Sequence, residues 1–347
     1  MKEKIANRNL YFGKLVLAGL ISGLFLTLLL MMFHIYPFGT QSFLTEDLKY
    51  QYIDFFNWFK RVLNGSESIF YSPSQALGNN AWGIYSYYLG SPLNLLVFFF
   101  DYRHISLCIE IIVILKICLI QSLWTWYINR RFCLSLSFSF LIAMGITFGS
   151  WTMTNLRNPM WLDSLYILPL ISYGIHKIVV DRKMVYYIIG TSLNIICCWY
   201  TAYMCVLYSL VLFVVEFVLQ QTIVDSESNK FLFIKTVAVF TLANLISLLL
   251  SIWTLLPTVI AMLSSGGGDG TSFADSLSGI DFSSISSLIS SITTTDILKF
   301  FESFLPGSWD INITPQLYCG LLLELNYVVF LFSKNLSFKN KATLILF

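Results

Sequence analysis

The sequence predicts an all-α protein that crosses a membrane several times, and three observations support that fold class. Of the 347 residues, 56% are hydrophobic and only 12% are charged, whereas about a quarter of a soluble domain is charged. The mean hydropathy is +0.72. Apolar runs of about 20 residues, long enough to span a bilayer as helices, recur along the chain. Too few polar side chains remain to coat a soluble globule. The net charge of +2 is unremarkable, and we expect no nucleic-acid partner.

The apolar runs predict about eight membrane spans. The candidate spans are 14–33, 105–127, 134–153, 164–180, 185–199, 202–220, 232–258 and 316–332. One further run, 86–100, is ambiguous, because Gly90-Ser91-Pro92 interrupts it. Only about eight clean apolar residues follow this break, too few to cross. We therefore predict that 86–100 is interfacial or re-entrant.

Lysine and arginine residues predict the orientation of the spans. Basic residues precede the first span, so we place the N-terminus inside, because short cytoplasmic loops carry an excess of lysine and arginine. If 86–100 does not cross, the later basic clusters also fall inside, whereas counting it as a span would put them all outside. These clusters are Arg130/Arg131, Arg182/Lys183, Lys230/Lys235 and Lys334/Lys339/Lys341.

The predicted topology is one transmembrane domain, residues 1–347, with three segments on the outer side. Residues 34–104 form a long first loop with amphipathic helices, 154–163 a short loop, and 262–315 a second large loop rich in Ser, Gly and Thr. The final residues, KATLILF, are too short to cross. We expect them to begin a ninth span, so that the chain is the N-terminal part of a longer protein.

The stretch FLTEDLKYQYIDFFNWFKRVL, residues 43–63, predicts an amphipathic helix on the outer membrane surface. Thr45 is the expected N-cap, followed by Glu46 and Asp47 in the first turn, where the helix dipole favours acids. The expected apolar face carries Leu48, Tyr52, Phe55, Phe56, Phe59, Val62 and Leu63. The expected polar face carries Asp47, Gln51, Asp54, Trp58 and Arg61. This pattern leaves open whether the acids only stabilise the helix start or perform chemistry.

Cysteine and histidine spacing predicts neither a disulfide framework nor a metal site. The seven cysteines lie in or beside apolar runs without a C-x-x-C pair, and an odd number favours buried thiols acting as small hydrophobes. The three histidines are far apart in the chain. Glu46 and Asp47 are adjacent acids, which make poor geometry for a divalent cation. We therefore expect no metal and no other cofactor.

Five sequence motifs in this order resemble the bacterial YfhO membrane-protein family, within the GT-C-type glycosyltransferases. The motifs are TEDLKYQYIDFF (45–56), LGNNAWGIYSYYLGSPLNLLVFFF (77–100), NLRNPMWLDSLYILPLI (155–171), WYTAYMCVLYSL (199–210) and TPQLYCGLLLELNYVVFLFSK (314–334). The resemblance covers nearly the whole chain. It implies a GT-C-like helical bundle in the bacterial cell membrane, with a cytoplasmic N-terminus and an extracellular active face.

The resemblance also implies an activity. The expected reaction is inverting transfer of a sugar from an undecaprenyl-phosphate-linked donor to a cell-wall polymer such as lipoteichoic acid, at the surface of the lipid bilayer. Two alternatives remain: a transporter or flippase for a lipid-linked sugar, and a non-catalytic envelope assembly protein. A transporter is expected to place charged residues along a midplane path, whereas the charges here concentrate on the outer side.

The catalytic residues follow from the position of the first motif. In GT-C enzymes an acid in the first outer loop activates or orients the acceptor, and Asp47 matches that position, with Glu46 as the second choice. Arg157 is the first choice to meet the donor phosphate, and Arg103 and Arg61 are alternatives. Asp163 either pairs with Arg157, binds the acceptor, or begins the next helix as a favourable N-terminal acid.

Further residues are predicted to bind substrate or to line the site. Gln51, Tyr52 and Asn158, which lie in the same motifs, are assigned to substrate binding. Lys116 falls near mid-depth in a span and needs a partner from another span, because buried charges in membranes are costly. It is assigned to substrate binding, with a structural role as the alternative. The aromatic residues Trp82, Tyr85, Tyr87 and Tyr88 form either a sugar or lipid surface or an interfacial belt.

Overall fold

The computed structural model describes residues 2–75, 78–224 and 230–264, together with residues 298, 299, 302 and 330. Within these ranges the regular structure is helical except for one small antiparallel hairpin, in which β1 (Tyr71–Ser72) pairs with β2 (Asn79–Asn80). The predicted all-α fold of a polytopic membrane protein is confirmed. The expected last span, 316–332, and most of the second large loop lie outside the described residues.

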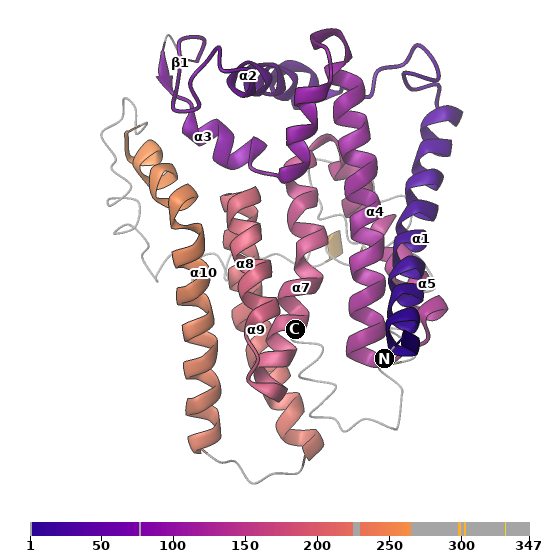
Figure 1. Cartoon of the computed structure of the whole chain (residues 1–347), viewed down its shortest axis with the longest axis vertical. Helices are drawn as coiled ribbons and strands as arrows, with labels where there is room; N and C mark the ends of the chain where they lie inside the picture. The colour runs from indigo at the N-terminus through magenta and orange to yellow at the C-terminus, as the bar shows by residue number, and fades with distance from the viewer. Residues whose placement is uncertain are drawn as a thin grey trace.

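The long helices run side by side as a bundle (Figure 1). They are α1 (Lys2–Met32), α4 (Ile105–Phe132), α5 (Leu136–Thr147), α7 (Pro159–Asp181), α8 (Val185–Cys197), α9 (Trp199–Val224) and α10 (Lys230–Ser264). The short helix α6 (Ser150–Thr154) and the 3-10 turn η5 (Asn155–Arg157) connect α5 to α7.

Four stretches of these helices are long and apolar enough to cross a membrane: Asn9–Met32, Tyr102–Phe132, Trp199–Gln220 and Phe233–Met262. A fifth span results if Leu136–Thr147 and Ser150–Arg157, which are bent by 47° relative to each other, count as one. The predicted runs 164–180 and 185–199 form α7 and α8, but α8 is short and α7 carries several charged residues. The structure therefore supports four or five spans by length and composition, and the expected number of about eight is not confirmed.

A layer of short elements covers the end of the bundle opposite the N-terminus (Figure 1). It comprises the π-helix η1 (Leu48–Tyr52), α2 (Ile53–Leu63), the hairpin, α3 (Trp82–Ile84), the π-helix η2 (Tyr85–Leu89) and the 3-10 helices η3 (Pro92–Phe99) and η4 (Tyr102–His104). We call this the layered end.

The ambiguous segment 86–100 lies in this layer as two short helices, η2 and η3, separated at Gly90 and Ser91. The 8 residues of η3 rise about 16 Å, at about 2.0 Å per residue, and the hydrocarbon core of a bilayer is about 30 Å thick. The segment is therefore too short to cross, as the interruption at Gly90 predicts.

The helix at residues 45–63 also forms, with two differences from the prediction. The helical stretch begins at Glu46, directly after the expected N-cap residue Thr45, but it continues as a π-helix from Leu48, which Asp47 precedes. The buried residues include Tyr52, Phe56 and Phe59 as expected, but also Trp58 and Lys60. Lys60 is buried because its Nζ donates to the Phe98 carbonyl oxygen at 3.0 Å, at the end of η3.

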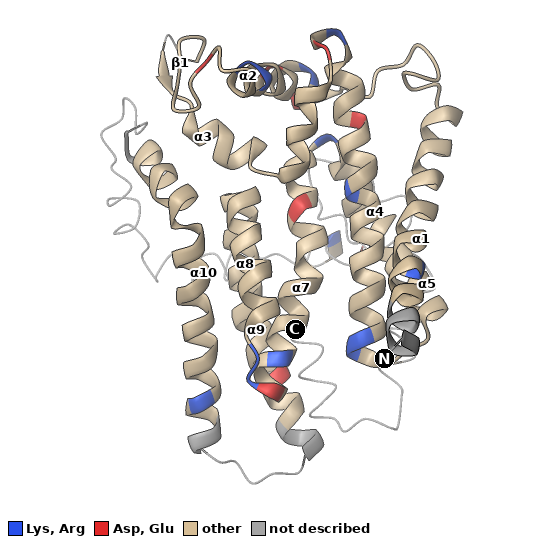
Figure 2. Ribbon diagram, in the orientation of Figure 1, with Lys and Arg blue, Asp and Glu red and all other residues tan. Residues whose placement is uncertain are grey.

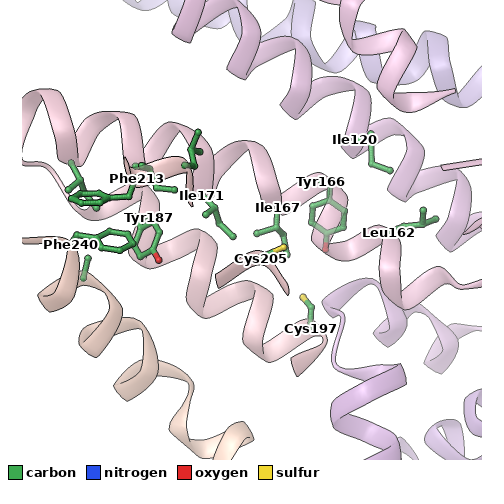
Figure 3. Close-up of a cluster of buried hydrophobic side chains, with 14 of the residues drawn as sticks. Ile120, Leu162, Tyr166, Ile167, Ile171, Tyr187, Cys197, Cys205, Phe213 and Phe240 are labelled. Carbon is green, nitrogen blue, oxygen red and sulfur yellow. The ribbon is translucent and has the colours of Figure 1, made fainter. Parts of the chain in front are cut away.

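Buried apolar side chains from α4, α7, α8, α9 and α10 form the main core (Figure 3). The labelled members are Ile120, Leu162, Tyr166, Ile167, Ile171, Tyr187, Cys197, Cys205, Phe213 and Phe240. The Tyr187 hydroxyl, fully enclosed, lies 3.0 Å from Ser209 Oγ and donates to Asn244 Oδ1 at 2.9 Å. Four of the described cysteines are buried, as expected for small hydrophobes, whereas Cys133 is exposed.

Helix α1 approaches α4 closely because two glycines leave room for it. A Cβ atom on Gly19 would lie 2.6 Å from the Cys118 carbonyl oxygen, and one on Gly23 would meet Cys118 Sγ. Small residues four positions apart are typical of closely packed membrane helices. The first span is thereby fixed against the helix that carries Lys116.

Basic residues lie at both ends of the bundle, but acidic residues accompany most of them at the layered end (Figure 2). Arg130 and Arg131 occupy the last turn of α4. Arg131 forms a bidentate ion pair with the buried Glu216 of α9, with both distances 2.9 Å, and His176 of α7 lies 3.3 Å from the same carboxylate. This charge distribution agrees with the pattern used to predict a cytoplasmic N-terminus, and the orientation itself stays a prediction.

Candidate functional site

A pocket of about 340 Å³ opens at the layered end, where η1, η2 and the start of α7 meet. It is lined by Glu46, Asp47, Gln51, Tyr52, Tyr87, Tyr88, Arg157, Asn158 and Trp161. We call it the carboxylate pocket. Six of the eight residues assigned to the site from sequence line it, although they come from two regions about a hundred positions apart in the chain.

The Asp47 side chain makes no capping hydrogen bond at the helix start. It occupies the N-cap position of η1, but its carboxylate accepts no capping hydrogen bond from the helix. The backbone N–H of Leu48 instead donates to the Thr45 carbonyl oxygen at 3.1 Å. The Asp47 carboxylate is therefore not occupied by a capping hydrogen bond, and, being exposed, it lines the pocket.

Glu46 forms an ion pair with Arg157 across the pocket. Its backbone adopts a φ of +47°, in the left-handed region that few residues other than glycine and asparagine favour. The Glu46 side chain is 58% exposed and that of Arg157 is 21% exposed. The pair therefore lies at the mouth of the pocket, where an incoming anion can reach the guanidinium group.

Arg157 and Asn158 are positioned by the abrupt start of α7. Arg157 ends η5, Asn158 is the N-cap residue, and Pro159 takes the first helical position, where its missing N–H is not needed. The Asn158 side chain makes no cap either. Its Oδ1 instead accepts a hydrogen bond from the Tyr52 hydroxyl at 3.2 Å, which joins the two halves of the pocket.

Tyrosine hydroxyls form the opposite wall. Burial raises the pKa of Tyr52 above its ordinary value, and the neighbouring Tyr88 and Asp47 raise it further. Burial also raises the pKa of Tyr88 to about 12. Both groups therefore remain protonated at neutral pH and can donate hydrogen bonds. Tyr87 and Tyr88, which the sequence left open between a substrate surface and an interfacial belt, line the pocket.

Lys116 and Asp163 lie outside the lining of this pocket, in a pair that is fully buried. Lys116 Nζ is 2.7 Å from Asp163 Oδ2, and both side chains are 0% exposed. Lys116 also donates to the Pro159 carbonyl oxygen at 2.9 Å, and Ser91 Oγ donates to Asp163 Oδ1 at 2.7 Å. Lys116 thus has a partner from another helix, α7, although α7 is not among the spans supported by length and composition. Asp163 pairs with Lys116 and not with Arg157, and neither buried group presents an atom to a substrate in this conformation.

Arg61 and Arg103, the alternative cations, and Glu110, an acid within α4, are also outside the pocket lining. Arg61 pairs with Glu67 at 2.5 Å on the other side of the layer. Arg103 is exposed in η4. Glu110 is only 2% exposed, and its Oε1 has no hydrogen-bond partner among the described residues. Arg157 is thus the cation that the described structure brings to the carboxylates.

Trp161 is the pocket residue that the sequence did not single out. It lies one turn after Asn158 in α7, and its ring lines the pocket beside Tyr87. The available signal was its spacing of four from Arg157, which places both on one side of a helix, but a break between η5 and α7 makes that spacing unreliable. Within the described ranges, no group of three or more His, Cys, Asp or Glu residues is placed to hold a metal ion.

The apolar helices and the layer over one end define a multi-pass helical membrane protein. The chain belongs to a family of bacterial membrane proteins: the family model described as bacterial membrane protein YfhO matches residues 19–347. No curated protein and no solved structure matches the chain.

Proposed function

We propose that this protein is a membrane glycosyltransferase of GT-C type that transfers a sugar from a polyprenyl-phosphate donor to a cell-envelope polymer on the outer face of the membrane. The observation that carries the proposal is the carboxylate pocket. It brings Asp47, which makes no capping hydrogen bond, to the same hollow as Arg157, at the layered end of the bundle.

Asp47 is the general base of the proposed step. The acceptor hydroxyl loses its proton to the Asp47 carboxylate while its oxygen forms a bond to the anomeric carbon of the donor sugar. The bond between that carbon and the phosphate oxygen breaks, and the phosphate leaves with the electron pair. Attack opposite the leaving group inverts the configuration at the anomeric carbon. No other reactant is required, and no metal is part of the proposal.

Arg157 stabilises the departing phosphate. A fixed cation near a developing anion lowers the barrier most when it is already in place. Arg157 is held by Glu46 before the donor arrives, but that carboxylate is largely exposed and can turn to water. We expect the phosphate to replace Glu46 as the partner of Arg157. Exchange of one anion for another keeps the guanidinium paired throughout.

Gln51, Tyr52 and Asn158 bind the hydroxyl groups of the sugar. Amide groups both donate and accept, and the protonated Tyr52 donates, so the wall offers hydrogen bonds suited to a polyhydroxylated ligand. The Tyr52–Asn158 hydrogen bond, at 3.2 Å, is long enough to be exchanged for bonds to substrate. Tyr87, Tyr88 and Trp161 supply aromatic faces beside them.

The test is the rate of sugar transfer by purified full-length protein in lipid vesicles, from a polyprenyl-phosphate sugar to the polymer acceptor. We expect Asp47→Asn to reduce the rate by about 10²–10⁴-fold, the usual contribution of a general base. Asp101→Asn is the matched control, because Asp101 is an exposed acid of the same layer that makes no cap. Transfer at the normal rate by folded Asp47→Asn protein would remove Asp47 from the mechanism.

A transporter for a lipid-linked sugar is the second candidate. The buried Lys116–Asp163 pair would support it, because charges at depth often mark a translocation path. Both groups are completely enclosed, however, and each is occupied by further hydrogen bonds. If vesicles move the lipid-linked sugar between leaflets but form no product, the transporter is correct and the enzyme is not.

A further inference from the structure

A second hollow, of about 420 Å³, lies between α2 and the hairpin. Helix α2 contributes Asp54, Asn57 and Trp58, and the hairpin contributes Ser72 and Gln75. None of these residues belongs to the carboxylate pocket. We call this the α2–hairpin hollow.

Two buried polar atoms of its lining residues have no hydrogen-bond partner among the residues that the structure describes. Trp58 is only 5% exposed, and its indole Nε1–H donates to no described group. Gln75 Oε1, also buried, accepts from none. An unsatisfied buried donor or acceptor costs about 1–3 kcal/mol, so native structures rarely leave one without water or a ligand. Here an unpaired donor and an unpaired acceptor belong to side chains that line the same hollow.

The position of Trp58 in the helix strengthens this observation. The spacing of α2 places Trp58 on the polar face, with Asp54 and Arg61. Trp58 is nevertheless buried, because it packs into the cluster of buried apolar residues that includes Phe56, Phe59 and Val97, and it lines the hollow as well. A tryptophan with an apolar body and an unpaired N–H, in a hollow that polar side chains also line, suits a ligand that has both C–H faces and hydroxyl groups.

The charged groups around the hollow favour an uncharged ligand over an anion. Arg61 lines it, but Glu67 pairs with Arg61 at 2.5 Å and neutralises its charge. The remaining charged group is the exposed carboxylate of Asp54. A phosphate or another anion would therefore meet net repulsion. Uncharged hydroxyl groups can accept from Trp58, donate to Gln75 and Asp54, and exchange bonds with Asn57.

An aromatic wall separates the two hollows. Tyr52 lines the carboxylate pocket, Phe55 lines the α2–hairpin hollow, and Tyr88 packs against both rings. The ring centroids are 6.3 Å apart for Tyr52 and Phe55, 5.0 Å for Tyr52 and Tyr88, and 4.9 Å for Phe55 and Tyr88. One aromatic cluster thus lies between the carboxylate pocket at η1 and the α2–hairpin hollow.

We propose that the α2–hairpin hollow binds a neutral, hydroxyl-rich ligand, namely a sugar or polyol unit, with Trp58 Nε1–H and Gln75 Oε1 as its buried hydrogen-bonding partners. This inference goes beyond the proposed function, because binding in the hollow requires no chemistry at Asp47. A ligand bound here would lie beside the carboxylate pocket, across the aromatic wall.

The test measures binding of the neutral disaccharide maltose to the purified full chain in lipid nanodiscs, by saturation-transfer NMR. Trp58→Phe keeps an aromatic ring and removes the N–H, and it should weaken maltose binding by about fivefold, the effect of one lost hydrogen bond. Asn57→Leu should weaken it as well. Trp151→Phe is the matched control, because Trp151 is exposed on α6 and lines neither hollow.

Three outcomes would overturn the inference. The first is no saturable maltose signal with wild-type protein. The second is equal affinity in the wild type and in folded Trp58→Phe. The third is stronger competition by glycerol 3-phosphate, an anionic probe, than by uncharged glycerol. If Asp47→Asn abolishes maltose binding while Trp58→Phe leaves it unchanged, the sugar binds in the carboxylate pocket and the hollow is not its site. Loss of transfer activity bears only on the proposed function.

Discussion

Two ion pairs hold the start of α7, and they differ in almost every physical respect. Glu46 and Arg157 meet at the mouth of the carboxylate pocket, with side chains 58% and 21% exposed. Lys116 and Asp163 meet in the interior, both 0% exposed. The comparison shows that charge alone does not identify a site residue in a membrane protein. The exposed pair can exchange one partner for a ligand, whereas the buried pair stabilises the packing between α4 and α7.

The energetics explain the difference. Taking two charges out of water is costly unless their remaining hydrogen-bonding capacity is also used. Lys116 has the Pro159 carbonyl as a second acceptor, and Asp163 has the Ser91 hydroxyl as a second donor. The exposed pair is worth no more than about 1 kcal/mol, as is usual for ion pairs near water. A phosphate can therefore replace Glu46 at little cost to the fold.

Breaking the buried pair should have the largest effect. Lys116→Met leaves the Asp163 carboxylate without its cation, and we expect a loss of about 3–5 kcal/mol in the free energy of unfolding. Thermal unfolding in detergent, together with the amount of protein in the membrane, measures this. The double variant Lys116→Met/Asp163→Leu should recover much of the loss. Normal stability of Lys116→Met alone would show that the Lys116–Asp163 pair does not stabilise the fold.

Removing the exposed cation should reduce activity without loss of stability. For Arg157→Gln we expect transfer to fall by about 10²–10³-fold, the usual effect of losing one group that stabilises a developing anion. The free energy of unfolding should change by less than about 1 kcal/mol. Rate and unfolding are measured on the same preparation. If Arg157→Gln unfolds as readily as Lys116→Met, Arg157 stabilises the fold and its role in the site is not supported.

Adding one methyl group at Gly90 should destabilise the packing of the segment beside the buried ion pair. Gly90 precedes Ser91, the hydrogen-bond donor to Asp163, and a Cβ atom at Gly90 would lie 2.9 Å from the Cys197 carbonyl oxygen and closer still to that of Ile196. Gly90→Ala should push the segment away from α8 and cost about 1–3 kcal/mol. The matched control is Gly83→Ala, because a Cβ atom at Gly83 would meet open space. Gly65 also has open space around it, but its positive φ would strain an alanine. Equal unfolding curves for Gly90→Ala and Gly83→Ala would contradict this packing.

Removing the exposed acid should have the smallest effect. Glu46→Gln frees Arg157 before the donor arrives, and stability should change by less than about 1 kcal/mol. We expect the KM for the lipid donor to fall or stay within a few-fold, because the phosphate no longer displaces a carboxylate. Steady-state transfer at varied donor concentration checks this. A loss of activity as large as that of Asp47→Asn would make Glu46 the base.

The sequence predicted most of the pocket but not how its parts are paired. Hydropathy and the break at Gly90 correctly predicted the helical class and the segment that does not cross. Periodicity predicted the helix at 45–63, but it placed Trp58 on the polar face, whereas tertiary packing brings this residue into an apolar cluster with Phe56 and Phe59. Likewise, the need of Lys116 for a partner was evident, yet only the fold could show that the partner is Asp163, which leaves Arg157 to Glu46.

The most direct measurement is the reaction of a cysteine placed in the carboxylate pocket with a membrane-impermeant maleimide on intact cells. Gln51→Cys, combined with Cys133→Ser and Cys319→Ser, provides an exposed thiol in the lining. We predict labelling from the outside that slows when the polyprenyl-phosphate sugar is abundant. Labelling only after the membrane is made permeable, or at a rate that the lipid donor leaves unchanged, would contradict an outward-facing donor site.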